Sequence, residues 1–219
     1  MTDFAAYRRK MIESQLRPNQ VLDTAVLAAF GEVPRERFVP ADLASCAYID
    51  DSVPLGAGRY LSEPRAAARL VQAVAPSVTS TVLIVGAGTG YLAAVVSRLA
   101  GNVIALECDV ELAARARAIL ADLGIGNVTV VTGDFRAGWP QNAPYDVILC
   151  DGGVAEVPQP LRDQLTEGGR LGAVITRNDG TVGHGVLMLK VRGTVSRRTL
   201  FDAVTPLLPG LGPQPAFVF

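Results

Sequence analysis

Three glycines at every second position, Gly86, Gly88 and Gly90, follow an apolar, β-branched run at 81–85. The run predicts a buried strand, and the apolar spacing after the glycines predicts a helix. Glycine lets the backbone turn sharply and approach a ligand where a Cβ would collide. A strand, a glycine turn and a helix in this order direct the helix N-terminus at a bound group. The turn is therefore a candidate ligand site, and a tight turn that binds nothing is the alternative.

The spacing of the glycines separates the candidate ligands. A dinucleotide-binding turn has the pattern G-x-G-x-x-G/A with a small residue in sixth place, whereas this chain has Tyr91 there. The G-x-G-x-G spacing favours S-adenosylmethionine, whose methionine part would pass over the turn. Gly86, Ala87, Gly88 and Gly90 are accordingly cofactor-binding candidates. A nucleotide-linked oxidoreductase is the last of the alternatives.

Two carboxylates follow the next two predicted strands. The apolar run at 103–107 ends in Glu107, about 20 residues after the glycine turn, where a carboxylate holds a pair of ribose hydroxyls. A third strand at 128–132 is followed by Asp134, which can accept a hydrogen bond from an adenine amino group. Either carboxylate alone is more often a helix cap or a solvated strand end. The two together, after a glycine turn, favour an adenosyl ligand.

Composition limits the class of protein. The 219 residues include 20 Lys and Arg and 21 Asp and Glu, a balance that argues against a nucleic-acid-binding surface. No apolar stretch approaches the length of a transmembrane helix, and the N-terminus lacks the apolar segment of a signal peptide. The 3 cysteines are widely separated and form no C-x-x-C, so neither a disulfide framework nor a metal site is expected. We expect a cytoplasmic protein that binds neither nucleic acid nor membranes.

The order of elements predicts the fold. Strands and helices alternate from Thr81 onward, which is typical of a Rossmann-like α/β fold with a mostly parallel, doubly wound sheet. A longer pair of strands near the C-terminus is expected to be antiparallel, and Ala216–Phe219 could extend an edge. The parallel strands are expected at 81–85, 103–107, 128–132, 146–150 and 171–175, and the longer pair at 185–192 and 196–204.

Helices are expected before the sheet begins. Residues 3–17 read as a polar helix that ends before Pro18, and Asp23 is a plausible N-cap for a second helix that runs to Phe30. A third helix is expected over 66–74, with Ser62 as its N-cap and a proline in its first turn.

The chain is expected to form one compact unit from two regions. Residues 41–60 read as irregular. Residues 1–80 are expected to form a helical cap and substrate loop, and 81–219 the methyltransferase-like core that binds the cofactor. Because the carboxyl ends of parallel strands meet at one edge of a sheet, the cap is expected to lie over that edge.

Further motifs surround the glycine turn. The segments Val33-Pro34-Arg35 and Phe38-Val39-Pro40 are specific to one family, whereas the turn is shared by many methyltransferases. With the other motifs, the chain resembles protein-L-isoaspartate O-methyltransferases from about residue 10 to about 190. The other matching motifs are Ser62-Glu63-Pro64, Gly133-Asp134, Gly138-Trp139, Ala143-Pro144-Tyr145-Asp146 and Gly168-Gly169-Arg170-Leu171.

The resemblance implies a repair reaction. These enzymes transfer a methyl group from S-adenosylmethionine to the stray α-carboxylate of isoaspartyl residues in damaged proteins or peptides, and S-adenosylhomocysteine is the other product. A carboxylate is already a nucleophile, so catalysis is mostly positioning and loss of water. The family assigns the Ser62 hydroxyl to the active site. Cys108 and Phe135, which follow the two carboxylates, join the cofactor-binding candidates.

The substrate loop departs from the family pattern. The usual G-Q-T-I-S-Q-P is replaced here by 58–64, in which Arg59 stands for an amide and Tyr60 for a threonine. Arg65 follows where an aromatic ring or histidine is usual. A guanidinium binds a carboxylate bidentately, so we predict that Arg59 or Arg65 binds the isoaspartyl carboxylate. Tyr60 is a further substrate-binding candidate.

Other departures fall next to the glycine turn. Ile84 replaces an acidic residue, Phe135 replaces a glycine, and Asp151-Gly152-Gly153 replaces the usual T-A-A. These changes leave two alternatives to a repair enzyme. One is a relative that uses S-adenosylmethionine on a different acceptor, and the other is a catalytically idle module that binds it for regulation.

Overall fold

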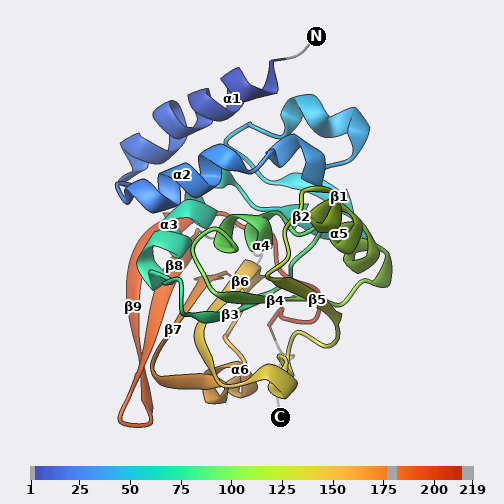
Figure 1. Ribbon diagram of the computed structural model, residues 1–219. Coiled ribbons are helices and arrows are strands. Elements are labelled where there is room, and N and C mark those ends of the chain that lie inside the picture. Colours follow the sequence, from blue (N-terminus) through green and yellow to red (C-terminus); the bar gives the residue numbers. More distant parts are fainter. Residues whose placement is uncertain (1–2, 177–181, 214–219) are drawn as a thin grey trace, which may run out of the picture.

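The computed structural model describes residues 3–176 and 182–213, which are built around a seven-stranded sheet (Figure 1). Its strands are β3 (Thr81–Val85), β4 (Asn102–Glu107), β5 (Val128–Thr132), β6 (Tyr145–Val154), β7 (Leu165–Ile175), β8 (Gly183–Val191) and β9 (Thr194–Ala203). They lie in the order β5-β4-β3-β6-β7-β8-β9. Strands β5, β4, β3, β6 and β7 are parallel, whereas β8 and β9 pair antiparallel. This pairing confirms the predicted mostly parallel sheet with an antiparallel C-terminal pair.

The two faces of the sheet pack against different partners. Val82 and Ile84 lie in one hydrophobic cluster, whereas Leu83 and Val85 lie in the other, as the two-residue period of a strand requires. The first cluster includes residues of α3 (Pro64–Val74), α4 (Tyr91–Val96) and α5 (Val110–Asp122). The second includes residues of α6 (Gln159–Asp163) and of the C-terminal segment, such as Leu208. The sheet is therefore covered on both sides.

The N-terminal helices lie along one end of the molecule, above α3 and α4 in Figure 1. The predicted helix over 3–17 is α-helical only as α1 (Phe4–Met11) and continues as a π-helix at Ile12–Leu16 and a 3-10 turn at Arg17–Asn19. The helical run ends at Gln20, whose left-handed φ of 65° takes the backbone out of the helical conformation. The Asp23 cap of α2 (Thr24–Glu32) is confirmed, since its carboxylate accepts from the Ala25 amide at 2.8 Å.

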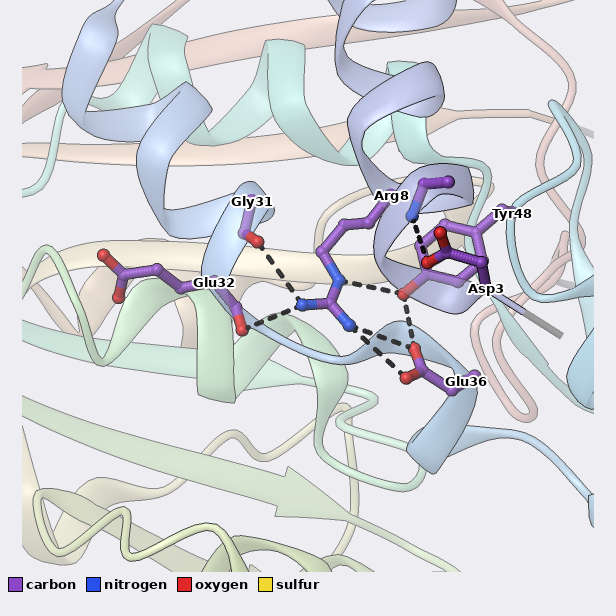
Figure 2. A network of polar contacts seen from close by, with 7 residues as sticks. Asp3, Arg8, Gly31, Glu32, Glu36 and Tyr48 are labelled. Carbon is purple, nitrogen blue, oxygen red and sulfur yellow. Dashed lines mark hydrogen bonds and ion pairs between the residues drawn. The ribbon is translucent and has the colours of Figure 1, made fainter. Parts of the chain in front are cut away.

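Arg8 fastens α1 to the rest of the N-terminal region (Figure 2). Its Nε donates to the Tyr48 hydroxyl at 3.0 Å, and its Nη2 lies 3.3 Å from Glu36 Oε1. The same guanidinium reaches the carbonyls of Gly31 and Glu32 at the end of α2, each at 3.5 Å. One side chain thus ties three segments of the N-terminal region together.

The segment expected to be irregular contains a hairpin. Strands β1 (Val53–Gly56) and β2 (Arg59–Leu61) pair antiparallel. The alternation of β2 buries Arg59 and Leu61 and leaves Tyr60 exposed. The hairpin therefore sends a guanidinium inward and the tyrosine ring outward.

The start of α3 differs from the sequence prediction. The N-cap position belongs to Glu63, and the expectation that Ser62 caps this helix is wrong. Pro64 occupies the first turn and has no amide hydrogen, so this turn presents one fewer donor for a cap to satisfy. The Ser62 hydroxyl is instead directed at the sheet, where it donates to Asp151.

Strand β6 runs four residues past the predicted end at position 150. The extension is stabilised by the C-terminal segment: the Gly153 amide donates to the Pro206 carbonyl, and the Leu208 amide to the Gly153 carbonyl, each at 2.8 Å. Asp151 consequently lies inside a strand rather than after it. The edge predicted at 216–219 lies outside the described residues.

Arg35 is fully buried between the N-terminal region and the sheet. Its Nε donates to the Ala47 carbonyl at 2.5 Å and its Nη2 to the Ser62 carbonyl at 2.6 Å. The guanidinium carbon lies 4.7 Å from the centroid of the Tyr91 ring, which also packs edge-on against Phe38. Arg35 therefore joins the 3-10 helix at 35–38, the loop before α3 and the first residue of α4.

Replacement of this arginine tests its structural role. We expect Arg35→Ala to lower the free energy of unfolding by about 3–5 kcal/mol, because two buried carbonyls lose charged donors. Arg37→Ala is the matched control two residues away, where an exposed ion pair with Asp122 is lost. That change should cost less than about 1 kcal/mol. Urea denaturation followed by circular dichroism measures both, and equal losses would contradict the role given to Arg35.

Candidate functional site

The glycine turn joins β3 to α4 with three left-handed residues. Gly86, Gly88 and Gly90 have φ angles of 85°, 56° and 95°, which side chains other than glycine rarely adopt. Gly90 is the N-cap residue of α4. The sharp turn predicted from the sequence is confirmed, and the amide of Gly88 points to the end of the neighbouring strand.

Glu107 ends β4 beside this turn and is completely buried. Its Oε2 accepts from the Gly88 amide at 2.6 Å. Its Oε1 accepts from the amides of Cys108 and Asp109 at 2.9 and 3.2 Å. The carboxylate that sequence spacing assigned to a ribose therefore does lie against the glycine turn.

The second carboxylate lies in a different environment. Asp134 is exposed, and its Oδ1 accepts from the Arg136 amide at 2.9 Å. Phe135 is buried among the second hydrophobic cluster, with the Arg59 guanidinium carbon 5.6 Å from its ring centroid. The Cys108 side chain is exposed at the end of β4.

The predicted substrate-binding residues do not come together. Arg59 is 2% exposed; its Nη2 donates to the Gly86 carbonyl at 2.6 Å and its Nε lies 3.3 Å from Glu107 Oε2. Arg65 lies at the start of α3, 3.3 Å from Glu63 Oε1. Tyr60 lies on the outer face of the hairpin. Arg59 thus belongs with the cofactor-binding candidates rather than with the other two.

Ser62 and Asp151 form a buried pair close to that cluster. The Ser62 hydroxyl donates to Asp151 Oδ1 at 2.6 Å. Burial raises the pKa of Asp151 to about 6, and the hydrogen bond from Ser62 and the charges of Arg59 and Arg35 oppose the rise. Near neutral pH the carboxylate beside Ser62 is therefore mostly ionised, and modest acidification protonates it.

The residues at the turn offer the polar groups that would bind an adenosyl group, with the exception of Ile84. Glycines allow close backbone approach, and Glu107 and Asp134 follow successive strands. Ile84, however, is buried in the first hydrophobic cluster and offers no polar group. The space beside Gly86 holds side chains, since a Cβ there would lie 2.9 Å from Arg59 Nη2 and 2.5 Å from Leu208 Cδ2. The donor set fits the group, and the guanidinium of Arg59 fills part of the space beside the turn.

Sequence reasoning gave no role to three residues of this region. Arg35 donates a hydrogen bond to the carbonyl of Ser62, and Asp151 accepts one from the hydroxyl of Ser62. Leu208 packs over Gly86 and Gly152. Arg35 shares the segment 33–39 with two further charged residues, Glu36 and Arg37, and the local sequence does not mark it as the buried one of the three. Nothing in the local sequence around Leu208 indicates its place over the turn.

Comparisons with known proteins point to one family. Residues 6–185 match the sequence profile of the family described as protein-L-isoaspartate(D-aspartate) O-methyltransferase. Protein-L-isoaspartate O-methyltransferase 2 of Anaeromyxobacter sp. is 46% identical over 75% of this chain and 68% of its own. The protein-L-isoaspartate O-methyltransferase of Methylorubrum populi is 41% identical over 97% of this chain and 99% of its own.

A solved structure shares the fold. It belongs to a Plasmodium falciparum protein described as a protein-L-isoaspartate O-methyltransferase in complex with S-adenosyl-L-homocysteine. The TM-score is 0.77 with 20% sequence identity, and the likeness covers 95% of this chain and 99% of that chain.

The burial of Asp151 beside Ser62 predicts that the stability of the fold depends on pH. The pKa of Asp151 rises from 3.8 to about 6 on folding, so the folded state binds the proton more tightly and loses stability as pH rises through this range. The free energy of unfolding of the wild type minus that of Asp151→Asn should fall by about 2–3 kcal/mol between pH 4 and pH 7. Urea titrations of both proteins at several pH values measure the difference. A difference that is flat or grows with pH would contradict the burial of an ionised Asp151.

Proposed function

The chain belongs to the protein-L-isoaspartate(D-aspartate) O-methyltransferase family, and from this premise we propose its reaction. We propose that it transfers a methyl group from S-adenosylmethionine to the α-carboxylate of L-isoaspartyl residues in damaged proteins. The methyl ester then recyclises to a succinimide, which can reopen to a normal aspartyl residue. The protein is in this proposal a repair enzyme.

The observation that carries the proposal is the contact between Glu107 and the glycine turn. The carboxylate lies 2.6 Å from the Gly88 amide at the carboxyl ends of β3 and β4, next to the point where the strand order reverses. Open α/β sheets bind ligands at this position. The Plasmodium falciparum neighbour, which shares the fold, holds S-adenosyl-L-homocysteine.

The proposed roles follow from the chemistry of each group. S-adenosylmethionine, when bound, supplies a methyl group on a sulfonium. Glu107 would accept from the ribose hydroxyls, Asp134 from the adenine amino group, and the turn at 86–90 would lie under the methionine part. Ser62 would contact the acceptor carboxylate. The acceptor brings its own nucleophile, so positioning and exclusion of water are what these residues contribute.

A second candidate function rests on Asp151. Its Oδ1 accepts a hydrogen bond from the Ser62 hydroxyl at 2.6 Å. An ionised carboxylate at that place repels an anionic acceptor and can take the proton of a neutral hydroxyl acceptor. A relative of the repair enzymes that methylates a hydroxyl is therefore the alternative.

We propose isoaspartyl-containing proteins as the partners and the cytoplasm as the location. The three cysteines support a reducing compartment, because Cys46, Cys108 and Cys150 are all free thiols at separate places. Among the helices of the described residues, none combines the length and the apolar character that crossing a membrane requires.

Methyl transfer to matched peptides tests the reaction. The full chain with radiolabelled S-adenosylmethionine should label an isoaspartyl peptide and leave the otherwise identical aspartyl peptide unlabelled. Base-labile counts in the peptide measure the ester. Equal labelling, or none in either peptide, would reject repair activity, and labelling of a hydroxyl-bearing acceptor instead would favour the second candidate.

Two substitutions test the proposed division of the site. Asp134→Ala should raise the dissociation constant for S-adenosylhomocysteine by about tenfold, because the adenine amino group loses one hydrogen bond to a charged acceptor. Ser62→Ala should leave that constant within about twofold and lower kcat. Isothermal titration calorimetry and steady-state kinetics measure the two effects. The reverse order of affinities would show that the adenine position is misassigned.

A further inference from the structure

Arg59 is the buried side chain whose position the proposed reaction does not explain. It comes from β2, is 2% exposed, and donates through Nη2 to the Gly86 carbonyl at 2.6 Å. Its Nε lies 3.3 Å from Glu107 Oε2, and its guanidinium carbon lies 5.6 Å from the centroid of the Phe135 ring. A guanidinium is therefore enclosed by the first glycine, the strand-end carboxylate and an aromatic face.

Glu107 has no acceptor capacity to spare in this arrangement. A carboxylate offers about four lone-pair sites. Oε1 accepts from two backbone amides, those of Cys108 and Asp109, and Oε2 accepts from the Gly88 amide and from Arg59. Three of these donors belong to the backbone of the fold. The guanidinium of Arg59 is the donor that a side-chain rotation can remove.

The same guanidinium fills space next to the glycine turn. A Cβ built on Gly86 would lie 2.9 Å from Arg59 Nη2, so the volume that the missing side chain leaves open is taken by this arginine together with Leu208. A ligand that lies over the turn and reaches Glu107 meets Arg59 at both places.

We infer that Arg59 is an internal occupant of the cofactor site that must leave Glu107 before a ribose binds there, and that it thereby sets the affinity for the cofactor. The inference rests on the proposed function, because it takes the ligand of Glu107 to be an adenosyl ribose. Arg59 also acts electrostatically on a second buried carboxylate, that of Asp151, which lies beside Ser62.

The competition predicts a definite direction for binding. The apparent dissociation constant of a ligand is the intrinsic constant divided by the fraction of the protein in the competent state. A charge-assisted contact that holds Arg59 in place keeps that fraction low. Removal of the guanidinium should therefore tighten binding, by about tenfold to a hundredfold.

The experiment compares S-adenosylhomocysteine binding to the full chain in three forms: wild type, Arg59→Gln and Arg37→Gln. Glutamine keeps an amide donor for the Gly86 carbonyl and removes the charge. Arg37 is the control, since its guanidinium forms an exposed ion pair with Asp122 rather than with Glu107. Calorimetry gives the constants. Trp139, the single tryptophan of the chain, lies 3.3 Å from a Cβ built on Gly133 and serves as a fluorescence reporter.

The expected result is tighter binding by Arg59→Gln and an unchanged constant for Arg37→Gln. Arg59→Lys, whose ammonium cannot hold Glu107 and the Gly86 carbonyl in the same planar geometry, should fall between wild type and Arg59→Gln. It also serves as the test variant if Arg59→Gln does not fold, as judged by circular dichroism.

Other outcomes separate this inference from the function on which it rests. Equal or weaker binding by the folded Arg59 variants, with measurable binding by the wild type, would overturn the role of Arg59 alone. An absence of binding by every folded variant at millimolar ligand would overturn the proposed cofactor, and the inference with it. Binding by Arg59→Gln where the wild type shows none would support the inference in its strongest form.

Discussion

The buried carboxylate of Glu107 is the constraint around which the site is arranged. A charge with no access to water destabilises a fold unless it is paired and hydrogen-bonded. Glu107 meets this requirement with amides from the glycine turn and from the end of β4, and with the guanidinium of Arg59. One of the amides is that of Asp109, whose side chain caps α5. The turn, the neighbouring strand, the next helix and the hairpin are thereby held by one anion.

A buried cation performs the corresponding task for the N-terminal region. Arg35 donates to the carbonyls of Ala47 and Ser62 and lies against the Tyr91 ring at the start of α4. Ser62 is then held twice, by its carbonyl through Arg35 and by its hydroxyl through Asp151. A hydroxyl fixed by surrounding hydrogen bonds is preorganised, as the contact with the acceptor proposed for Ser62 requires.

The sequence predicted those parts of the structure that depend on local periodicity. The bounds of β3 and β5 were predicted to the residue, and the Asp23 cap was predicted from its side chain and the apolar residues that follow. The hairpin was not, because β1 and β2 are short and a proline and three small residues interrupt them. Without the hairpin, the inward direction of Arg59 could not be predicted either.

The extension of β6 escaped prediction for a different reason. It depends on hydrogen bonds between Gly153 and residues about 50 positions later in the chain, and no local pattern encodes such a pairing. The position of Asp151 inside the strand, opposite Ser62, follows from the extension. The fold class was therefore readable from the sequence, whereas the contacts of the buried charges required the tertiary structure.

The departures from the family pattern are physically linked. Arg59 and Asp151 carry opposite charges, both are buried, and the charge of Arg59 acts against the rise in the pKa of Asp151. Either charge alone would be costly in this environment, whereas the two together offset part of each other's desolvation. Phe135 adds an aromatic face under the guanidinium. Through the charge of Arg59, the site that would hold the cofactor is coupled electrostatically to the site that would hold the acceptor.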